Sequence, residues 1–549
     1  MNAMNKPLFL KDTSNTVLYI LFAIVLLGFF IRVWNVGSAE VFHDEGFYAF
    51  RSIGYVDYLY NDDQSTPIQW FKDSPELPWW TKISFHDHPP LFFIIQHGFF
   101  SLLGDSLFVA RLPSLIAGII AIIMAFVLAK TLFRDDKVAL FSSLALSVNH
   151  IHIWISRSSI MESVLFTLIL VNIYFFFRFV RDYNKWLGFG LTLGLIFFTK
   201  YIGFFLIPAY LLYFLLCNRS YFTKRQSYYA ILIAFVFLIP TIIYNISMYK
   251  AVGHFDLQFG SLLHQQLPEW KGAVGKLKDP FSDIFGNIFS MYSVPFIILA
   301  LGGMIYGLFK DIRLKRATTL YFLIVLSVTV MLTRVGSAFR FLTLYLPSLL
   351  FFTTLVFKVA YDYLKNGILL KILLTAFILY EGYFMYDGIY RTFPDFGIVK
   401  LDQYLDSALE GKRSLAVPKS PNPHLDKIIQ ENFSRLPPGD KPVLIIYDEN
   451  IDLSARVWLF GRRMYYHGVP SVSTGHFKSL MRERGPDAFS GYIIYFVKIA
   501  PYGLVNPYFQ TPDADEFEVF LKRELSLTPD TTITGYEELP AMYVYKIIL

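Results

Sequence analysis

Two acidic residues and a histidine follow the first strongly apolar segment of the chain. They stand in the sequence His43-Asp44-Glu45, about ten residues beyond the apolar run 16–33. A carboxylate near the hydrocarbon boundary of a membrane is costly unless it is paired, hydrated or functional. One interpretation is a helix N-cap, in which Asp44 accepts hydrogen bonds from free backbone N–H groups. The other is catalysis, with Asp44 and Glu45 as the candidate catalytic residues.

A second polar cluster, His86-Asp87-His88, lies directly before a double proline and the short apolar segment 91–103. The prolines fix the start of that segment, so His88 should sit just outside the N-terminus of a helix. Such a terminus together with an imidazole can hold a phosphate group. The alternative is a divalent metal ion, because the His-x-His spacing allows one. Its candidate ligands are His43, Asp44, His86 and His88.

Four further charged residues should approach the outer ends of the apolar runs. Lys200 interrupts an apolar stretch, Glu162 opens one, and Arg111 and Arg340 stand near the start of two others. Snorkelling toward the membrane surface is the ordinary explanation for a lone cation at such a place. Several cations and acids that converge on one face of the membrane indicate a site instead.

The composition is that of a polytopic membrane protein. Of the 549 residues, 54% are hydrophobic and only 17% are charged, which is not the balance of a soluble globular protein. The formal charge of +6 is explained by basic cytoplasmic loops rather than by an anionic partner, and no nucleic acid is expected as a partner. The single cysteine, Cys217, excludes an internal disulfide and a multi-thiolate metal site.

About eleven apolar runs are candidates to cross a bilayer, which takes about 20 residues of helix. They fall at 16–33, 109–133, 138–155, 163–180, 186–199, 202–217, 229–249, 287–309, 318–332, 341–360 and 367–386. Segment 91–103 reaches only about 20 Å as a helix, short of the roughly 30 Å hydrocarbon core. We therefore predict that it lies in the membrane interface.

The positive-inside rule tests that choice, because counting 91–103 as a span would reverse the side of every later loop. With it left out, the basic short loops all lie on the cytoplasmic side; they are 134–137, 181–185, 218–227 and 310–316. A first outer loop with interfacial helices, 35–110, the turn at Lys200 and everything after about Asp387 then lie on the opposite face.

Beyond residue 388 the composition becomes that of a soluble α/β domain. Strands are predicted at 442–447, 492–497 and 542–548, and helices at 453–463, 475–484 and 516–525. Alternation of this kind favours a small, mostly parallel sheet with helices packed on it. The predicted architecture is therefore an α-helical transmembrane domain, 1–388, followed by an extracytoplasmic α/β domain, 389–549.

The motifs, in their order along the chain, resemble those of the integral-membrane GT-C glycosyltransferases. They are the acidic pair after the first helix, HPPL at 88–91, ARLPS at 110–114, SRSSIME at 156–162, FTKYIG at 198–203 and RFLTLYLP at 340–347. The likeness is strongest to the dolichyl-phosphate-mannose protein mannosyltransferases and their bacterial relatives, including the aminoarabinose transferases that modify lipid A. It covers roughly residues 16–350.

Two departures from these families bear on the acceptor. Aminoarabinose transferases usually have Lys before the double proline and Arg soon after the acidic pair, where this chain has His88 and Phe47. The His-Pro-Pro form is closer to the protein mannosyltransferases, yet no segment resembles their lumenal β-trefoil module. The acceptor therefore stays open among a protein, a lipid and a glycan.

The resemblance implies transfer of a sugar from a polyprenyl-phosphate donor, on the outer face of the plasma membrane, with inversion at the anomeric carbon. An acceptor hydroxyl is a poor nucleophile, so a carboxylate base is expected, and Asp44 is the first choice. Cations must stabilise the departing lipid phosphate; the candidates are His88, Lys200, Arg340 and Arg111. Glu162 and His86 are candidates to orient acceptor or sugar hydroxyls. No cofactor is assigned, and the divalent metal ion stays open.

Two other functions stay open on the sequence. A flippase or other transporter of lipid-linked sugars would also be polytopic and bind a lipid phosphate, but it would carry charges deep within its spans and a site reachable from both sides. A non-catalytic membrane scaffold that presents the tail domain would give no role to Asp44, Lys200 and Arg340 together. The sequence therefore favours a glycosyltransferase.

Overall fold

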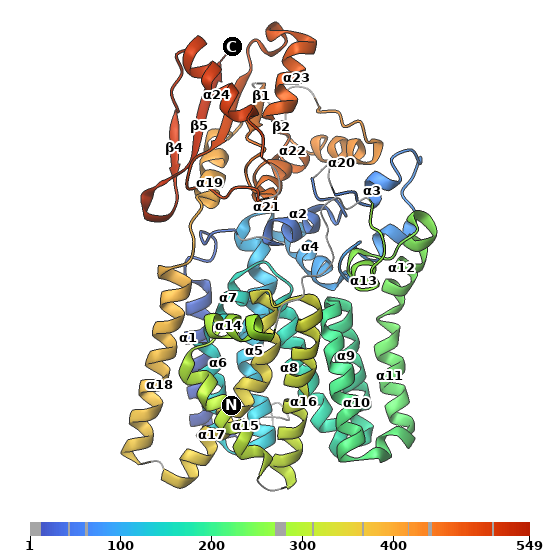
Figure 1. Cartoon of the computed structure of the whole chain (residues 1–549), viewed down its shortest axis with the longest axis vertical. Coiled ribbons are helices and arrows are strands. Elements are labelled where there is room, and N and C mark those ends of the chain that lie inside the picture. The colour runs from blue at the N-terminus through green and yellow to red at the C-terminus, as the bar shows by residue number, and fades with distance from the viewer. Residues whose placement is uncertain are drawn as a thin grey trace.

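The computed structural model describes residues 13–41, 44–60, 64–268, 281–309, 312–364, 367–414, 417–437, 442–507 and 510–548. An upright bundle of helices forms one layer, and a smaller domain with a β-sheet forms another at one end of it (Figure 1). Short helices lie between the two layers, among them α2 (Asp44–Gly54) and α4 (Leu91–Leu103). The predicted site residues of the first outer loop therefore lie where the two layers meet.

Six described helices of the bundle are long and apolar enough to cross a membrane. They are α1 (Asn15–Val33), α5 (Leu107–Phe133), α8 (Glu162–Arg181), α16 (Ile312–Val335), α17 (Leu346–Leu364) with the preceding turn η7 (Phe339–Tyr345), and α18 (Ile368–Tyr386) with η8 (Asp387–Arg391). The number rises to nine if three bent pairs each count as one span. The pairs are α6 (Asp136–Ser147) with α7 (His150–Arg157), α11 (Arg225–Val236) with α12 (Ile239–Val252), and α14 (Phe281–Met291) with α15 (Val294–Leu308). The prediction of a polytopic helical membrane protein is confirmed.

The bundle differs from eleven full spans because some predicted runs are short or bent. α9 (Trp186–Thr199) has 14 residues, or about 21 Å of helix, and α10 (Leu206–Cys217) follows a tight turn, η5 (Tyr201–Phe205). The predicted span 287–309 is broken by a bend of 118°, so that α14 lies across the bundle while α15 runs upright (Figure 1). Ser293 caps the new helix through the N–H of Phe296, a signal that hydropathy does not register.

The segment 91–103 forms one helix, α4, in the layer between the bundle and the sheet domain (Figure 1). It ends at Gly104, whose φ of 82° lies in the left-handed region that glycine adopts at no steric cost. The Gln96 amide donates to the carbonyl of Ala110 at 2.7 Å and to the hydroxyl of Ser159 at 2.6 Å. These bonds tie α4 to α5 and to the segment that leads into α8.

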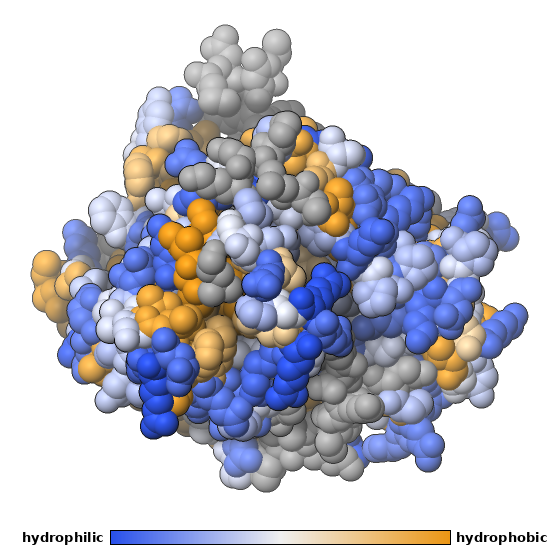
Figure 2. Space-filling model, turned by 90° about the horizontal axis from the view of Figure 1, so that it is seen from above, coloured by the Kyte–Doolittle hydropathy of each residue, from blue (hydrophilic) through white to orange (hydrophobic). Residues whose placement is uncertain are grey.

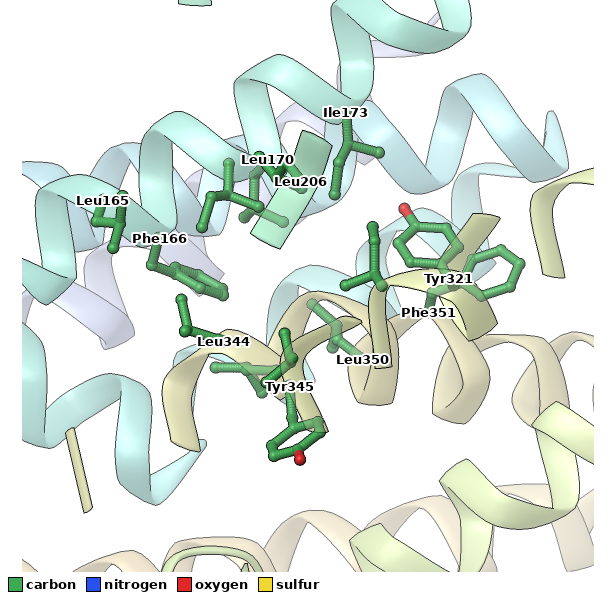
Figure 3. Packing of buried hydrophobic residues seen from close by; sticks show 14 of the residues in the cluster. Leu165, Phe166, Leu170, Ile173, Leu206, Tyr321, Leu344, Tyr345, Leu350 and Phe351 are labelled. Carbon is green, nitrogen blue, oxygen red and sulfur yellow. The ribbon is translucent and has the colours of Figure 1, made fainter. Parts of the chain in front are cut away.

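The core of the bundle fixes the outer ends of its helices. Figure 3 shows Leu165, Phe166 and Leu170 of α8 near Leu344 and Tyr345 of η7 and near α17. The Leu342 carbonyl of η7 accepts a hydrogen bond from the buried Tyr292 hydroxyl at 2.8 Å. The position of Arg340 is therefore set by a turn whose following residues are buried in the core.

The second domain contains a five-stranded sheet with the strand order β2-β1-β3-β5-β4. β1 (Val443–Tyr447) pairs in parallel with β2 (Ser471–Ser473) and with β3 (Ile493–Ile499). β5 (Pro540–Ile548) runs antiparallel to β3 and to β4 (Thr531–Thr534). The predicted mostly parallel sheet is therefore wrong, and the sheet is mixed. The short connection from β4 to β5 can join only antiparallel neighbours.

Helices cover this sheet and complete the chain. In the sheet domain they are α19 (Ile398–Ala408), α20 (Pro423–Phe433), α21 (Leu453–Arg456), η9 (Val457–Gly461), α22 (Arg462–Tyr466), α23 (Thr474–Arg484), η10 (Pro486–Phe489), α24 (Asp513–Glu524) and η11 (Tyr536–Glu538). The remaining elements are α3 (Pro67–Trp70), η3 (Trp79–Lys82), η4 (Tyr183–Lys185), η6 (Arg219–Thr223) and α13 (Leu257–Leu262).

Seen from above, the surface carries mainly hydrophilic residues with scattered apolar patches (Figure 2).

Helix α2 is packed against the sheet domain at very short range. Its third residue is Gly46, where an added Cβ would collide with the backbone oxygen of Ser454 at the start of α21. The buried Phe50 of α2 also packs against Tyr465 of α22, with ring centroids 6.0 Å apart. The sheet domain therefore fixes the helix that carries Asp44 and Glu45.

The substitution Gly46→Ala is expected to destabilise the protein by about 1–3 kcal/mol, because one of two packed backbones must move. The midpoint of thermal unfolding of the detergent-purified chain measures the change. Gly98→Ala in α4 is the matched control, since its Cβ would meet no atom within 4 Å and alanine favours a helix by up to about 1 kcal/mol. Equal midpoints for the two variants would contradict the close packing at Gly46.

Candidate active site

A cavity of about 600 Å³ lies where α2 and the segment before α4 meet α10, α13, α16 and η7. One part of its wall is charged, and the residues there are Asp44, Arg51, Asp87, His88, Lys200, Arg334 and Arg340. The rest is largely apolar, with Pro208 of α10, Phe259 of α13 and Met331 of α16 among the lining residues. The cavity therefore offers a place for a ligand with one charged and one apolar part.

Four residues predicted from the sequence line this cavity: Asp44, His88, Lys200 and Arg340. Arg340 donates from Nη1 to Oδ2 of Asp44 at 2.8 Å. The side chains of both residues are partly accessible, with exposed fractions of 29% and 27%. An acid from α2 and a base from η7, almost three hundred residues apart in the sequence, thus form an ion pair in the cavity wall.

Glu162 connects the two principal cations, Lys200 and Arg340. Lys200 donates from Nζ to Glu162 Oε1 at 2.7 Å, and Arg340 Nε lies 3.6 Å from the same oxygen. The ring of Phe341 lies beneath both cations, 5.4 Å from the Lys200 nitrogen and 4.9 Å from the Arg340 guanidinium carbon. Such cation–π contacts attract a cation to the face of the ring. Glu162 therefore positions the cations rather than lining the cavity itself.

Tyr48 is a cavity residue that the sequence analysis missed. Its hydroxyl donates to Oδ2 of Asp44 at 3.3 Å and lies 3.3 Å from Nε2 of His88. Tyr48 follows Asp44 by four residues in α2, so the two side chains share one face of the helix. That spacing is the sequence signal that could have found it.

Arg51, a residue of the cavity wall, binds two aspartates. Its guanidinium donates to Asp57 at 2.7 Å and to both oxygens of Asp87 at 2.7 and 3.1 Å. Burial alone would raise the pKa of Asp87, yet the positive charge of Arg51 holds that pKa well below its usual range. Asp87 is therefore a permanent carboxylate beside His88, whose Nδ1 lies 3.0 Å away.

His86 is fully buried beside the same network. Its Nδ1 lies 2.6 Å from Oδ1 of Asp57, and its backbone N–H donates to Oδ2 of Asp57 at 2.8 Å. It is not among the residues described as lining the cavity. The sequence predicted that His86 orients a hydroxyl group of the substrate. In the structure His86 instead contacts Asp57 and holds together the loop before α4.

Glu45 and Arg111 form a buried ion pair that also stands outside the cavity lining. Arg111 donates from Nε and Nη2 to the two oxygens of Glu45 at 3.0 and 2.8 Å. It also donates to the carbonyls of Val36, Ala39 and Glu40 at 2.6 to 2.8 Å, and the backbone N–H of Ser159 donates to Glu45. The pair therefore ties α2 to α5 and to the chain that follows α1.

Within the described residues, no group of three or more His, Cys, Asp or Glu side chains is placed to hold a metal ion. Of the four predicted metal candidates, His43 lies outside those residues. Asp44 pairs with Arg340, His86 with Asp57, and His88 lies against Asp87 and Tyr48.

The chain resembles known glycosyltransferases in sequence and in fold. Residues 87–244 match a family model described as dolichyl-phosphate-mannose-protein mannosyltransferase. No curated protein matches the sequence significantly. The fold is similar to that of ArnT from Cupriavidus metallidurans bound to undecaprenyl phosphate, at 11% identity and a TM-score of 0.55, over 97% of this chain and 98% of that one. The apo form of the same protein gives 12% identity and a TM-score of 0.52, over 96% and 97%. The predicted resemblance is confirmed.

The substitution Arg111→Met is expected to cost about 3–5 kcal/mol of stability, because it leaves the Glu45 carboxylate buried without its partner. Adding Glu45→Gln should recover part of that loss, since the remaining side chain is uncharged. Thermal unfolding in detergent measures both changes.

Lys427→Met is the matched control for Arg111→Met. The Lys427 ammonium makes an exposed contact at 3.9 Å with Glu431, and exposed pairs of this kind contribute about 0–1 kcal/mol. If Arg111→Met unfolded at the same temperature as Lys427→Met, the structural role of the buried pair would be refuted.

Proposed function

We propose that the chain is a polyprenyl-phosphate-dependent glycosyltransferase and that it transfers the sugar within the cavity described above; the family match over residues 87–244 supports this. The acceptor is a hydroxyl group of a protein, a lipid or a glycan. The observation that carries this proposal is the ion pair of Asp44 and Arg340 in the cavity wall. It places a candidate base next to a candidate phosphate ligand, as transfer from a sugar phosphate requires.

Asp44 is the general base in this proposal. Its carboxylate removes the proton of the acceptor hydroxyl as the hydroxyl oxygen attacks the anomeric carbon. The bond between that carbon and the phosphate oxygen breaks, and the electron pair leaves with the lipid phosphate. Attack and departure from opposite faces of the sugar give inversion at the anomeric carbon.

Lys200 and Arg340 hold the lipid phosphate. Both cations reach the cavity wall, and both are paired with carboxylates, Glu162 and Asp44. Hydrogen bonds from cations to phosphate are strong and favour the state with more negative charge. Because the phosphate gains charge as the sugar leaves, these contacts are stronger in the transition state than with the bound donor. A phosphate that attracts Arg340 also weakens its hold on Asp44, which makes Asp44 a better base.

The polyprenyl chain occupies the apolar part of the cavity. Residues 327–335 of α16 contribute lining positions over about 12 Å of helix, and Pro208 of α10 also lines the cavity. A ligand whose phosphate contacts Lys200 can therefore lay its first apolar units between these two helices. The homologous fold of ArnT, described as bound to undecaprenyl phosphate, supports this assignment.

We also propose that the cavity and the sheet domain face the outside of the plasma membrane, with the boundary between the two domains near residue 388. The basic short loops predicted to be cytoplasmic support this orientation, because they connect the helix ends that lie far from Asp44. A lipid-linked donor presents its phosphate at headgroup height, which matches a cavity at the junction of the two layers.

Purified protein supplied with a panel of undecaprenyl-phosphate hexoses is expected to release undecaprenyl phosphate in the presence of acceptor. Asp44→Asn should slow this release by about 10²- to 10⁴-fold, since the amide cannot accept the proton. Asp283→Asn, an exposed position in α14, is the matched control and should retain the wild-type rate.

Release at the wild-type rate from Asp44→Asn would show that Asp44 is not the base. Lipid-linked sugars moved across liposomes by the wild type, with no release from any donor, would instead favour a transporter.

A further inference from the structure

The hydroxyl of Tyr48 stands between the proposed base and an imidazole. It lies 3.3 Å from Oδ2 of Asp44 and 3.3 Å from Nε2 of His88. The other nitrogen of that ring, Nδ1, lies 3.0 Å from the carboxylate of Asp87. Four polar groups, all of them cavity-lining residues, therefore follow one another along the cavity wall, each within reach of the next.

The surroundings hold this row of groups in place. Tyr48 is buried, and its ring packs edge-on against His88, Phe92 and Phe93, with centroids 5.4, 6.3 and 5.6 Å away. Asp87 is fixed by the guanidinium of Arg51 through both of its oxygens. Tyr48 therefore keeps its hydroxyl within reach of Asp44 and His88 without a change of rotamer.

A base that has taken a proton must lose it before the next reaction. Asp44 lies beside Arg340 in the cavity wall, and 27% of its side chain is exposed; a product bound in the cavity would cover this exposed part and restrict its access to water. This step rests on the proposed function, because it is needed only if Asp44 accepts a proton. We propose that the proton leaves Asp44 through Tyr48 to His88, and that Asp87 stabilises the resulting imidazolium.

The transfer balances without any further reactant. The O–H bond of the acceptor breaks, and its proton binds Oδ2 of Asp44. That proton then passes to the oxygen of Tyr48 while the hydroxyl proton of Tyr48 passes to Nε2 of His88. Asp44 is again a carboxylate, Tyr48 is again a phenol, and His88 has become a cation that later releases its proton to water.

The charges around the row suit this transfer. Burial raises the pKa of Tyr48 well above its usual range, with Asp44, Glu162 and Asp87 adding to the effect of burial and Arg340 opposing it. The phenol therefore exchanges one proton for another and never carries a negative charge.

The pKa of His88 is lowered, chiefly by burial. Lys200 and Arg51 lower it further, while Asp87 opposes them. The ring therefore starts neutral, and the Asp87 carboxylate, 3.0 Å from Nδ1, favours the tautomer with the proton on Nδ1, which leaves Nε2 as an acceptor. The nearby cations also keep the imidazolium short-lived, so that it gives up its proton before the next reaction.

In this proposal His88 accepts a proton, whereas the sequence predicted that it contacts the phosphate. Its Nε2 lies beside the Tyr48 hydroxyl, and Lys200 and Arg340 bind the phosphate. Tyr48 and His88 act on the reaction through Asp44, so both are positioning and proton-transfer residues rather than groups that touch the reacting atoms.

Two variants test the transfer in the full-length enzyme. Tyr48→Phe removes only the hydroxyl and keeps the ring contacts. His88→Gln retains an oxygen that can accept a hydrogen bond from Tyr48 but that cannot hold a proton. Each should lower kcat for undecaprenyl phosphate release by about tenfold or more, within the range that proton transfer contributes. The KM for the donor should change by less than about twofold, because neither group binds the donor in this proposal.

The double variant and the pH profile separate proton transfer from support of the fold. Because both residues serve one step, the double variant should be no slower than the slower single variant. The wild-type rate should fall at acidic pH as His88 becomes protonated before the reaction, and this part of the profile should be absent from both variants. Tyr55→Phe, a neighbouring tyrosine outside the row, is the matched control and should retain the wild-type kcat.

A Tyr48→Phe enzyme with the kcat and pH profile of the wild type would overturn the proposal. So would a slow Tyr48→Phe enzyme beside a His88→Gln enzyme of normal rate, because that result would mean that Tyr48 only orients Asp44. A wild-type enzyme that releases no undecaprenyl phosphate from any donor would instead contradict the proposed function. Release that depends on Asp44 but not on Tyr48 and His88 would contradict only the proposed proton transfer.

Discussion

The buried ion pair between Glu45 and Arg111 is the constraint on which the rest of the site depends. A carboxylate withdrawn from water must be matched by charge and hydrogen bonds, and Glu45 obtains them from Arg111 and the backbone of Ser159. Arg111 uses its remaining donors on three carbonyls after α1. Successive residues of a helix point about 100° apart, so anchoring Glu45 behind α2 leaves Asp44 facing the cavity. Of the two neighbouring acids, Glu45 therefore supports the helix, and Asp44 is the one available for the proposed role as base.

The sheet domain holds this arrangement from the other side. Gly46 allows the backbone of α21 to contact α2, and Glu40 accepts hydrogen bonds from the backbone N–H groups of Phe396, Ile398 and Val399 at the start of α19. His467 of the sheet domain also lies 2.7 Å from Asp105, just before α5. The helix with the proposed base is therefore clamped between two domains, which suits a site that must hold its groups in fixed geometry.

Three cations of the cavity wall are each paired with a carboxylate. Lys200 pairs with Glu162, Arg340 with Asp44, and Arg51 with Asp87. In the proposed mechanism a lipid phosphate competes with the carboxylates for these cations. Binding of the donor therefore weakens the pairing of Arg340 with Asp44 and thereby activates the base. The pairing with Arg51 also holds Asp87 in place, so that Asp87 is a fixed negative charge beside His88.

The sequence by itself determined which residues carry charge at the membrane surface and on which predicted face they lie. Hydropathy and loop charge are local properties, so Asp44, His88, Lys200 and Arg340 could be selected before their contacts were known. Only the tertiary structure decided that Glu45 and Arg111 pair with each other, that Tyr48 joins Asp44 to His88, and that half of the strand pairings are antiparallel. These features depend on contacts between distant segments or on the direction in which a side chain is turned. Neither residue type nor spacing along the chain specifies such contacts, because burial and packing select one pairing among several that the same residues allow.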